Sequence, residues 1–477
     1  MNKISLSLIL AGLLTGCAIG PDYARPDVAV PDTFIHSETN TTANFAIERE
    51  WWKTFNDPSL TQAVEEALNT NFDIQSAQAS VDALLGQFDQ AKSYLYPQIN
   101  ANASLDRKGV DNVSNGGYQL REGITSTYAG SLSLASYEID LFGKVRRANE
   151  AARAALLSSE YASQTIKLSV TSSVAASYVK LSSLQAQIDL ARQNVALTKE
   201  LVLFNDLKYK HGVIAESVLL QSLSEHENAK ATLSALEASK TAEEATFNTL
   251  LGRNPKAVHV SSINAIDVPK IPDALPSSVL SKRPDIAAAE QKLIAANAKI
   301  GVAKAAYFPS IKLTGMLGVQ SLELTDFVSN PARIWEVVPS ISIPIFSAGR
   351  IAGEVKTAEA DRNQSIAQYK KAIVSAFNDT DNALAQKSKA QEQVSFQQSR
   401  AAAIEKALTQ SKLRYQVGSI SYSDMLLVQQ QWLQASQQLI IAKQNALTST
   451  ILLYKVFGGG WSEELTPPLP DLLPAGR

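Results

Sequence analysis

Residues 303–318 read AKAAYFPSIKLTGMLG, and their pattern changes at Pro309. Small, alanine-rich residues compatible with a helix precede this proline, whereas apolar and other residues alternate after it. The stretch therefore predicts a helix that runs directly into a β-strand. Residues 91–106, AKSYLYPQINANASLD, repeat the change at Pro97. Because proline ends a helix and is tolerated as the first residue of a strand, we predict helix-to-strand junctions at Pro97 and Pro309.

These two junctions belong to a tandem duplication. Matching stretches recur at offsets of 206 or 212 residues: Tyr209-x-x-Gly212 with Tyr415-x-x-Gly418, Gly252 with Gly458, and residues 71–74 with 283–286. The small change in offset indicates loops of different length. The chain is therefore predicted to contain two repeats of about 200 residues each.

Long segments of each repeat contain neither proline nor glycine. These segments are residues 144–211 and 213–251 in the first repeat, and 354–417 and 419–457 in the second. Segments of this length predict helices far longer than those of ordinary domains, reaching roughly 96 Å for 64 residues. Each repeat is expected to contain a helix (about 59–94 or 285–306), two strands, a very long helix, a tip and a returning helix. A seven-residue apolar repeat from Met425 onward favours supercoiled packing of the last helix.

Four candidate strands each have one apolar and one polar face. They are expected near residues 97–107, 126–142, 309–320 and 335–346, with exposed loops at 108–125 and 321–334. The apolar phase of the second strand slips near Ala135–Ser136, so its register is the least certain. This alternation is typical of a transmembrane β-barrel, and a half-buried sheet in a soluble protein has the same pattern.

A membrane-spanning sheet cannot leave its edges open, because unpaired backbone groups in lipid cost several kcal/mol each. Four strands cannot close a barrel, so several copies of the chain would have to share one. Two copies would give eight strands, whose interior side chains fill, and three copies would give twelve. A pore therefore requires more than two copies.

The N-terminus has the features of a secretion signal. Lys3 precedes an apolar run, residues 4–14, that is too short to span a bilayer and suits a signal peptide. The run ends in Leu14-Thr15-Gly16-Cys17, which resembles a bacterial lipobox, although an ordinary signal peptide with an incidental cysteine is the alternative. We predict that Cys17, the only cysteine, carries covalent lipid such as palmitate. Ala18 is not the aspartate that typically retains lipoproteins at the inner membrane, so the outer membrane is the expected location.

The composition argues against several other classes of protein. The 44 Lys and Arg residues balance 46 Asp and Glu residues, so no basic surface for nucleic acid is indicated. The four histidines lie far apart, with no metal-ligand spacing. We find neither a nucleotide-binding loop nor a nucleophile elbow. The sequence therefore predicts no enzyme, no metal site and no cofactor beyond the lipid on Cys17.

Several short stretches together resemble the TolC-like outer-membrane efflux proteins, in the lipoprotein (NodT/OprM/CusC-type) branch. The matching stretches are Trp51-Trp52-x-x-Phe55-x-Asp57-Pro58-x-Leu60, residues 137–146 (YEIDLFGKVR), Arg283-Pro284-Asp285-Ile286, residues 303–309 (AKAAYFP), Pro344-Ile345-Phe346-x-x-Gly349-Arg350 and Tyr415-x-x-Gly418. With the lipobox they cover nearly the whole chain from Cys17 to Gly458.

The resemblance implies a mixed α and β membrane protein. Its fold would be a TolC-like homotrimer with a shared 12-stranded β-barrel, continued by a long α-helical barrel that extends into the periplasm of a Gram-negative bacterium. The expected divisions are a signal peptide (1–16), a lipidated linker (17–58), two outer-membrane-efflux repeats (59–264 and 265–460) and a C-terminal tail (461–477).

The same resemblance implies a function and partners. The chain would be the passive exit duct of a tripartite efflux pump, working with a periplasmic adaptor (membrane fusion protein) and an inner-membrane pump of the resistance-nodulation-division type. Its cargo would be drugs or other toxic small molecules, as in multidrug resistance. Two alternatives stay open: an exit duct for type I protein secretion, and a non-conducting periplasmic coiled-coil lipoprotein.

The helical hairpin tips carry the expected site residues. By resemblance, Asp424, Tyr415 and Ser217 would lie at the pore aperture, with Ser217 as the partner of Tyr415. Three Asp424 carboxylates would form a ring that prefers cations. Alternatively, Asp424 is the N-cap or a first-turn acid of a helix, and Ser423 could equally serve as the cap. The residues expected to face the adaptor are Tyr209, Gly212, Val213, Gly418, Ser419 and Ile420.

Overall fold

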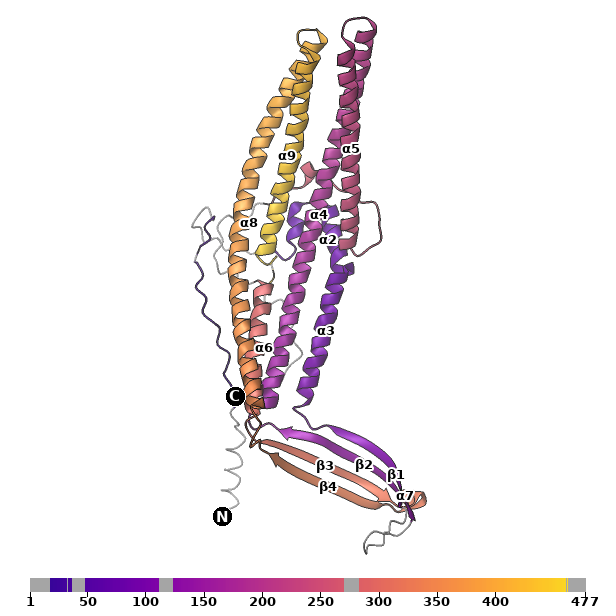
Figure 1. Ribbon diagram of the computed structural model, residues 1–477, viewed down its shortest axis with the longest axis vertical. Helices are drawn as coiled ribbons and strands as arrows, with labels where there is room; N and C mark the ends of the chain where they lie inside the picture. Colours follow the sequence, from indigo (N-terminus) through magenta and orange to yellow (C-terminus); the bar gives the residue numbers. More distant parts are fainter. Residues whose placement is uncertain are drawn as a thin grey trace. The chain divides into compact units, whose positions relative to one another are not determined.

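The computed structural model describes residues 18–31, 33–36, 48–110, 123–269, 283–459 and 461 (Figure 1). The predicted signal peptide, Cys17 and residues 462–477 lie outside the described residues. The chain divides into two compact units. The first contains Met1–Asp27, Ser80–Ser159 and Ala289–Tyr369, and the second contains Val28–Ala79, Glu160–Ala288 and Lys370–Arg477. Each unit therefore draws on both sequence repeats.

The helices occur in matching sets, which confirms the long helices predicted for each repeat. The first repeat contains α2 (Pro58–Thr70), α3 (Phe72–Ser93), α4 (Lys144–Lys210) and α5 (Glu216–Leu250); the second contains α6 (Pro284–Ala305), α8 (Arg350–Gln416) and α9 (Tyr422–Val456). The very long helices have 67 residues each and the returning helices 35 each. Within the described residues, no helix combines the length and apolar character needed to cross a membrane.

The helix predicted over residues 59–94 is wrong in one respect, because it breaks into α2 and α3 at Asn71. Asn71 has an extended backbone, and its own N–H still bonds to Ala67 in the last turn of α2. Its side-chain oxygen accepts from the N–H groups of Asp73 and Ile74, at 2.8 and 3.1 Å. Asparagine competes in this way with the helical backbone, so it ends one helix and caps the next.

Four strands form one antiparallel sheet in the order β1-β2-β3-β4 (Figure 1). They are β1 (Ile99–Val110), β2 (Gly123–Ile139), β3 (Ser310–Ser321) and β4 (Ala332–Ser342). The pairing of β2 with β3 shifts between Leu134 and Tyr137. This β-bulge is the physical cause of the phase slip at Ala135–Ser136, because an extra residue in one strand reverses the faces of those that follow.

Several boundaries in the sheet differ from the predictions. Strand β1 spans Ile99–Val110 instead of 97–107, and β2 spans Gly123–Ile139 instead of 126–142, so both ends of the predicted loop 108–125 belong to strands. The predicted loop 321–334 contains the short helix α7 (Leu324–Ser329), and β4 begins at Ala332 and ends at Ser342 instead of spanning 335–346. Pro344 has no N–H for a sheet and lies just beyond this end. Most of the other predicted loop, residues 111–122, lies outside the described residues.

The junctions at Pro97 and Pro309 are short turns, so the prediction of a direct passage from helix to strand was slightly wrong. Residues 94–98 separate α3 from β1, and residues 306–309 separate α6 from β3. Pro97 lies two residues before β1, whereas Pro309 directly precedes β3. Neither proline is the first residue of its strand. Both still occupy the point where the helical hydrogen-bond pattern must stop.

The register of the sheet separates an apolar face from a polar one. Ala101, Leu132, Leu317 and Trp335 are direct cross-strand neighbours and lie on one face. The next residues along the strands, Asn100, Ser133, Met316 and Glu336, form a row on the opposite face. Leu317 and Trp335 are 63% and 75% exposed in the single chain. The middle of the apolar face therefore has no covering layer within the described chain, whereas Phe327 of α7 lies close to Gly130 on the same face.

The core of the second unit includes part of the predicted linker 17–58. The short helix η1 (Trp51–Phe55) buries Trp51 to 1% exposure, and the Trp51 ring stacks on Tyr454 with centroids 5.1 Å apart. Asp57 caps α2 and accepts a hydrogen bond from the Tyr178 hydroxyl at 3.0 Å. Residues 51–57 are thus a packed part of this unit, because their aromatic side chains need a core.

Candidate functional site at the hairpin tips

The two helical hairpins end in turns with the same geometry. Gly212 and Gly418 have φ values of +68° and +76°, a conformation that glycine adopts without strain. The N–H of each glycine donates to the carbonyl of the tyrosine three residues earlier, Tyr209 or Tyr415. This glycine-terminated helix end satisfies carbonyls that would otherwise lack a partner. The sequence repeat Tyr-x-x-Gly is therefore also a structural repeat.

An apolar cluster joins the two hairpins just behind these turns. Its buried members are Tyr415, Tyr422, Met425 and Leu426, with partly buried Leu201, Phe204, Val218 and Ile420 packed against them. Burial raises the pKa of the Tyr415 hydroxyl, and burial first and then the nearby Glu225 raise the pKa of Tyr422 to about 12. Both hydroxyls are therefore protonated at neutral pH.

The Tyr415 hydroxyl donates a hydrogen bond to Oδ1 of Asn205 on α4, at 2.6 Å. Asn205 is fully buried, and the Lys208 ammonium lies 4.3 Å from the centroid of the Tyr415 ring. The implied partner Ser217 is instead an exposed residue of α5. The prediction of Ser217 as the contact of Tyr415 was therefore wrong. Asn205 was missed, although a single asparagine among the apolar residues near the end of α4 is a visible signal.

Asp424 forms a capping box at the start of α9. The Asp424 N–H donates to the Ser421 hydroxyl at 3.1 Å, while Asp424 Oδ2 accepts from the Ser421 N–H and hydroxyl at 3.2 and 2.7 Å. The cap is thus Ser421, not Ser423, and Asp424 is the acid of its first turn. Ser421 engages only Oδ2 of this exposed carboxylate. A ring of such carboxylates stays a prediction.

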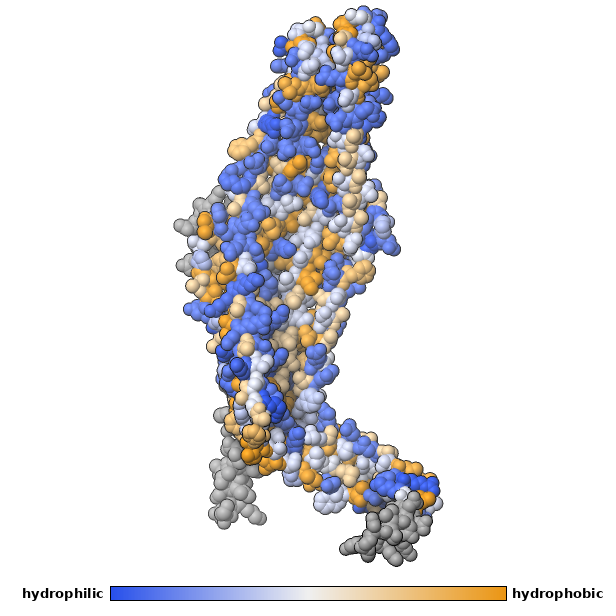
Figure 2. Space-filling view, in the orientation of Figure 1, coloured by the Kyte–Doolittle hydropathy of each residue, from blue (hydrophilic) through white to orange (hydrophobic). Residues whose placement is uncertain are grey.

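Most residues expected to face an adaptor lie at the surface of the tips. Tyr209, Gly212, Val213, Gly418 and Ser419 are exposed, whereas Ile420 packs partly against the apolar cluster. In the view of Figure 2, hydrophobic side chains lie among hydrophilic ones over the tips. Across the described residues, no three histidine, cysteine or acidic side chains are grouped to hold a metal ion. The exposed residues of the tips therefore offer a surface for contact.

Removing one partner of the Tyr415–Asn205 bond is expected to loosen the tip. Asn205→Ala leaves the buried Tyr415 hydroxyl without an acceptor, which costs about 1–3 kcal/mol. Hydrogen exchange of residues 412–426 should accelerate, with exchange near the base of the hairpins unchanged. The double variant Tyr415→Phe/Asn205→Leu removes both polar groups, so its exchange rates in residues 412–426 should be closer to those of the native protein. Equal acceleration in the single and double variants would show that the hydrogen bond itself contributes little.

Comparisons with known proteins agree with this architecture. The family model described as "Outer membrane efflux protein" matches residues 63–253 and 275–459. The chain is 32% identical to the probable efflux pump outer membrane protein TtgC of Pseudomonas putida, covering 97% of both chains. It is 30% identical to the probable outer membrane lipoprotein SilC of Salmonella typhimurium, covering 97% of this chain and 99% of SilC. The crystal structure of the CmeC channel of Campylobacter jejuni superposes with a TM-score of 0.86 at 25% identity, covering 94% of this chain and 96% of CmeC.

A four-stranded sheet with an uncovered apolar face, combined with paired long helical hairpins, is the fold of an outer-membrane efflux channel. The two family matches coincide with the two halves of the duplicated chain. The chain belongs to the outer membrane efflux protein family, and it is an outer-membrane component of an efflux system.

Proposed function

We propose that three copies of this chain form the passive exit duct of a tripartite pump for toxic small molecules. In this proposal the twelve strands close one β-barrel in the outer membrane, and the long hairpins form a helical barrel. A periplasmic adaptor would contact the tips, and an inner-membrane pump of the resistance-nodulation-division type would supply the energy. The chain itself would contribute a path and no catalysis.

The observation that carries this proposal is the sheet of the first unit. Strands β1 and β4 are its two edges, so each pairs on one side only within the described chain. Unpaired N–H and C=O groups next to lipid cost several kcal/mol each, so neighbouring copies must supply the missing partners. The apolar row through Leu132, Leu317 and Trp335 would then face lipid, and the polar row through Ser133 and Glu336 would face the water-filled lumen.

Each copy contributes four strands, and the interior of an eight-stranded barrel is filled by side chains. Three copies, with twelve strands, are therefore the smallest number that leaves an open lumen. We also propose that Cys17 is lipidated and anchors the chain to the outer membrane, as the lipobox indicates. The relative SilC is named a lipoprotein, which supports this assignment. Drugs and other toxic compounds are the proposed cargo, since the relatives belong to efflux systems.

Single-channel recording of the purified, detergent-solubilised oligomer tests the proposal directly. A trimeric duct conducts ions through planar bilayers, and its mass in solution corresponds to three chains. A non-conducting oligomer or a stable water-soluble monomer would overturn the proposal. Deletion of the gene should also raise sensitivity to several compounds in a panel of drugs, dyes and metal salts.

Asp424→Asn is expected to lower the preference of this channel for cations. The amide removes the negative charge, yet it keeps an oxygen that can accept from Ser421 in the capping box. Reversal potentials in a salt gradient measure the change. Glu216→Gln, at an exposed first-turn acid of α5, is the matched control and should change selectivity less. Equal selectivity in the Asp424→Asn and native channels would remove Asp424 from the constriction.

A further inference from the structure

The returning helices α5 and α9 end in the same way, and each leaves the carbonyl of its last residue for a side chain. At the end of α9, the N–H groups of Gly458 and Gly459 donate to the carbonyls of Lys455 and Tyr454. At the end of α5, Gly252 and Arg253 do the same to Thr249 and Asn248. The carbonyls of the last helical residues, Val456 and Leu250, are not used by these turns.

In the first repeat, Asn71 binds this remaining carbonyl. Its Nδ2 donates to the carbonyl oxygen of Leu250 at 2.8 Å, while its Oδ1 caps α3. Asn71 is almost completely buried. One amide side chain therefore ties the start of α3 to the end of α5.

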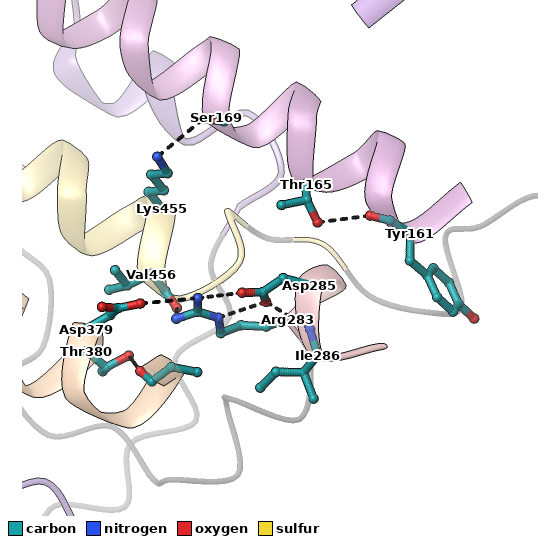
Figure 3. A network of polar contacts seen from close by, with 11 residues as sticks. Tyr161, Thr165, Ser169, Arg283, Asp285, Ile286, Asp379, Thr380, Lys455 and Val456 are labelled. Carbon is teal, nitrogen blue, oxygen red and sulfur yellow. Dashed lines mark hydrogen bonds and ion pairs between the residues drawn. The ribbon is translucent and has the colours of Figure 1, made fainter. Parts of the chain in front are cut away.

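In the second repeat, Arg283 binds the remaining carbonyl (Figure 3). Its Nη1 donates to the carbonyl oxygen of Val456 at 3.1 Å. Its Nε and Nη2 donate to both carboxylate oxygens of Asp285, at 3.0 and 2.7 Å, and Asp285 in turn accepts from the N–H of Ile286 in the first turn of α6. Asp379 of α8 lies 3.8 Å from Nη2. Arg283 is only 9% exposed.

The two arrangements are equivalent in the duplicated sequence. Asn71 and Arg283 differ by 212 positions, as their surrounding motifs do, and Leu250 and Val456 differ by the 206 positions that separate the glycine turns. The same carbonyl is thus bound from the same place in both repeats. The chemistry differs between the repeats. In the first, the neutral amide of Asn71 both binds the carbonyl and caps the next helix. In the second, the Arg283 cation binds the carbonyl and the Asp285 carboxylate accepts from the first turn of the next helix.

We propose that Arg283 is a positioning residue that fixes the base of the α8–α9 hairpin, as Asn71 fixes the base of α4–α5, and thereby sets where the tip lies. A cation is favoured at the end of α9, because the C-terminal carbonyls of a helix carry partial negative charge. A small change of angle at the base of α9 produces a large displacement of the tip. Over its 35 residues α9 extends about 52 Å, so a tilt of about 5° at Val456 moves its start, which carries Asp424, by about 4–5 Å.

The simpler alternative is that Arg283 only orients Asp285 for capping α6. In that case its loss would affect the first turn of α6 and leave the end of α9 unchanged. The contact with Val456 and the burial of the guanidinium favour the larger role, because a residue serving Asp285 alone has no need to reach another helix. This inference rests on the proposed function in one respect: the position of the tip matters because the tip would contact the adaptor.

Hydrogen exchange of the full-length oligomer, followed by mass spectrometry, tests the inference. Arg283→Ala should accelerate exchange in the last turn of α9, residues 453–457, by about tenfold, the value expected for losing a buried charged hydrogen bond. Exchange at the tip, residues 415–424, should also rise. Arg283→Lys keeps the charge and a donor, so it should restore much of the protection at both places.

Two control variants separate the possible causes. Asn71→Ala should accelerate exchange at the end of α5 and leave the end of α9 unchanged. Arg192→Ala removes an arginine from an exposed ion pair with Glu237 and should affect neither end. Faster exchange in α6 alone after Arg283→Ala, or no gain from lysine, would overturn the inference. Because exchange is measured without ion flow, a non-conducting native oligomer would refute the proposed channel without refuting this role of Arg283.

Discussion

Leu317→Lys is expected to abolish assembly in the outer membrane. Leu317 lies in the middle of the apolar row of the sheet, between Leu132 and Trp335. A lysine facing the middle of a bilayer costs about 2–4 kcal/mol, and every copy in the oligomer would carry one. The amount of heat-resistant oligomer in outer-membrane fractions should fall by tenfold or more, as measured by semi-native gel electrophoresis and immunoblotting.

Met316→Lys is the matched control, because Met316 is the neighbouring residue on the opposite face of the same strand. A lysine there would face the proposed water-filled lumen beside Glu336. The Met316→Lys oligomer should therefore assemble and conduct ions, with changed selectivity. Normal assembly of Leu317→Lys, or failure of both variants, would contradict the assignment of the two faces.

Trp51→Ala is expected to destabilise the second unit strongly. The Trp51 ring stacks on Tyr454, meets Trp52 and Phe55 edge-on, and is almost fully buried. Removing a buried tryptophan side chain leaves a large cavity and costs about 3–5 kcal/mol. The thermal unfolding midpoint of the purified oligomer should fall markedly. Circular dichroism at a helix-sensitive wavelength measures this midpoint.

Trp335→Ala provides the comparison for this measurement, since the Trp335 ring is exposed in the chain and fills no core. The thermal unfolding midpoint of the Trp335→Ala variant, measured from the helical signal, should stay close to that of the native protein. A small effect of Trp51→Ala would mean that residues 51–57 are a dispensable extension of the unit and not part of its core.

Much of the fold follows from local patterns in the sequence. Segments without proline and glycine predicted α4, α5, α8 and α9 almost to their ends, because only those two residues reliably interrupt such helices. The slip of the apolar phase at Ala135–Ser136 coincides with the β-bulge in the pairing of β2 with β3. Asn71 shows the limit of this approach: within a continuous helical pattern, nothing local distinguishes a tolerated asparagine from one that ends a helix.

The tip site was predictable in part. Gly212 and Gly418 were found from the repeated Tyr-x-x-Gly motif, since a positive φ favours glycine wherever the turn occurs. The partner of Tyr415 was not found, because Asn205 is 210 residues away in the chain and contacts it only after two hairpins pack together. Ser423 was offered as a possible cap of α9, whereas the structure uses Ser421, because both serines lie close to the start of the helical pattern and backbone geometry decides between them.

The sequence by itself determined the duplication, which appears as matching stretches at fixed offsets. It also determined the lengths of the helices, the two-faced strands and the positions of the turns, all of which depend on residues near one another in the chain. Only the tertiary structure decided which side chains join the two hairpins, and that Asn71 and Arg283 bind the same carbonyl in different ways. Such contacts depend on where distant segments meet. Many residue types can satisfy one buried carbonyl, so no local pattern specifies which of them does.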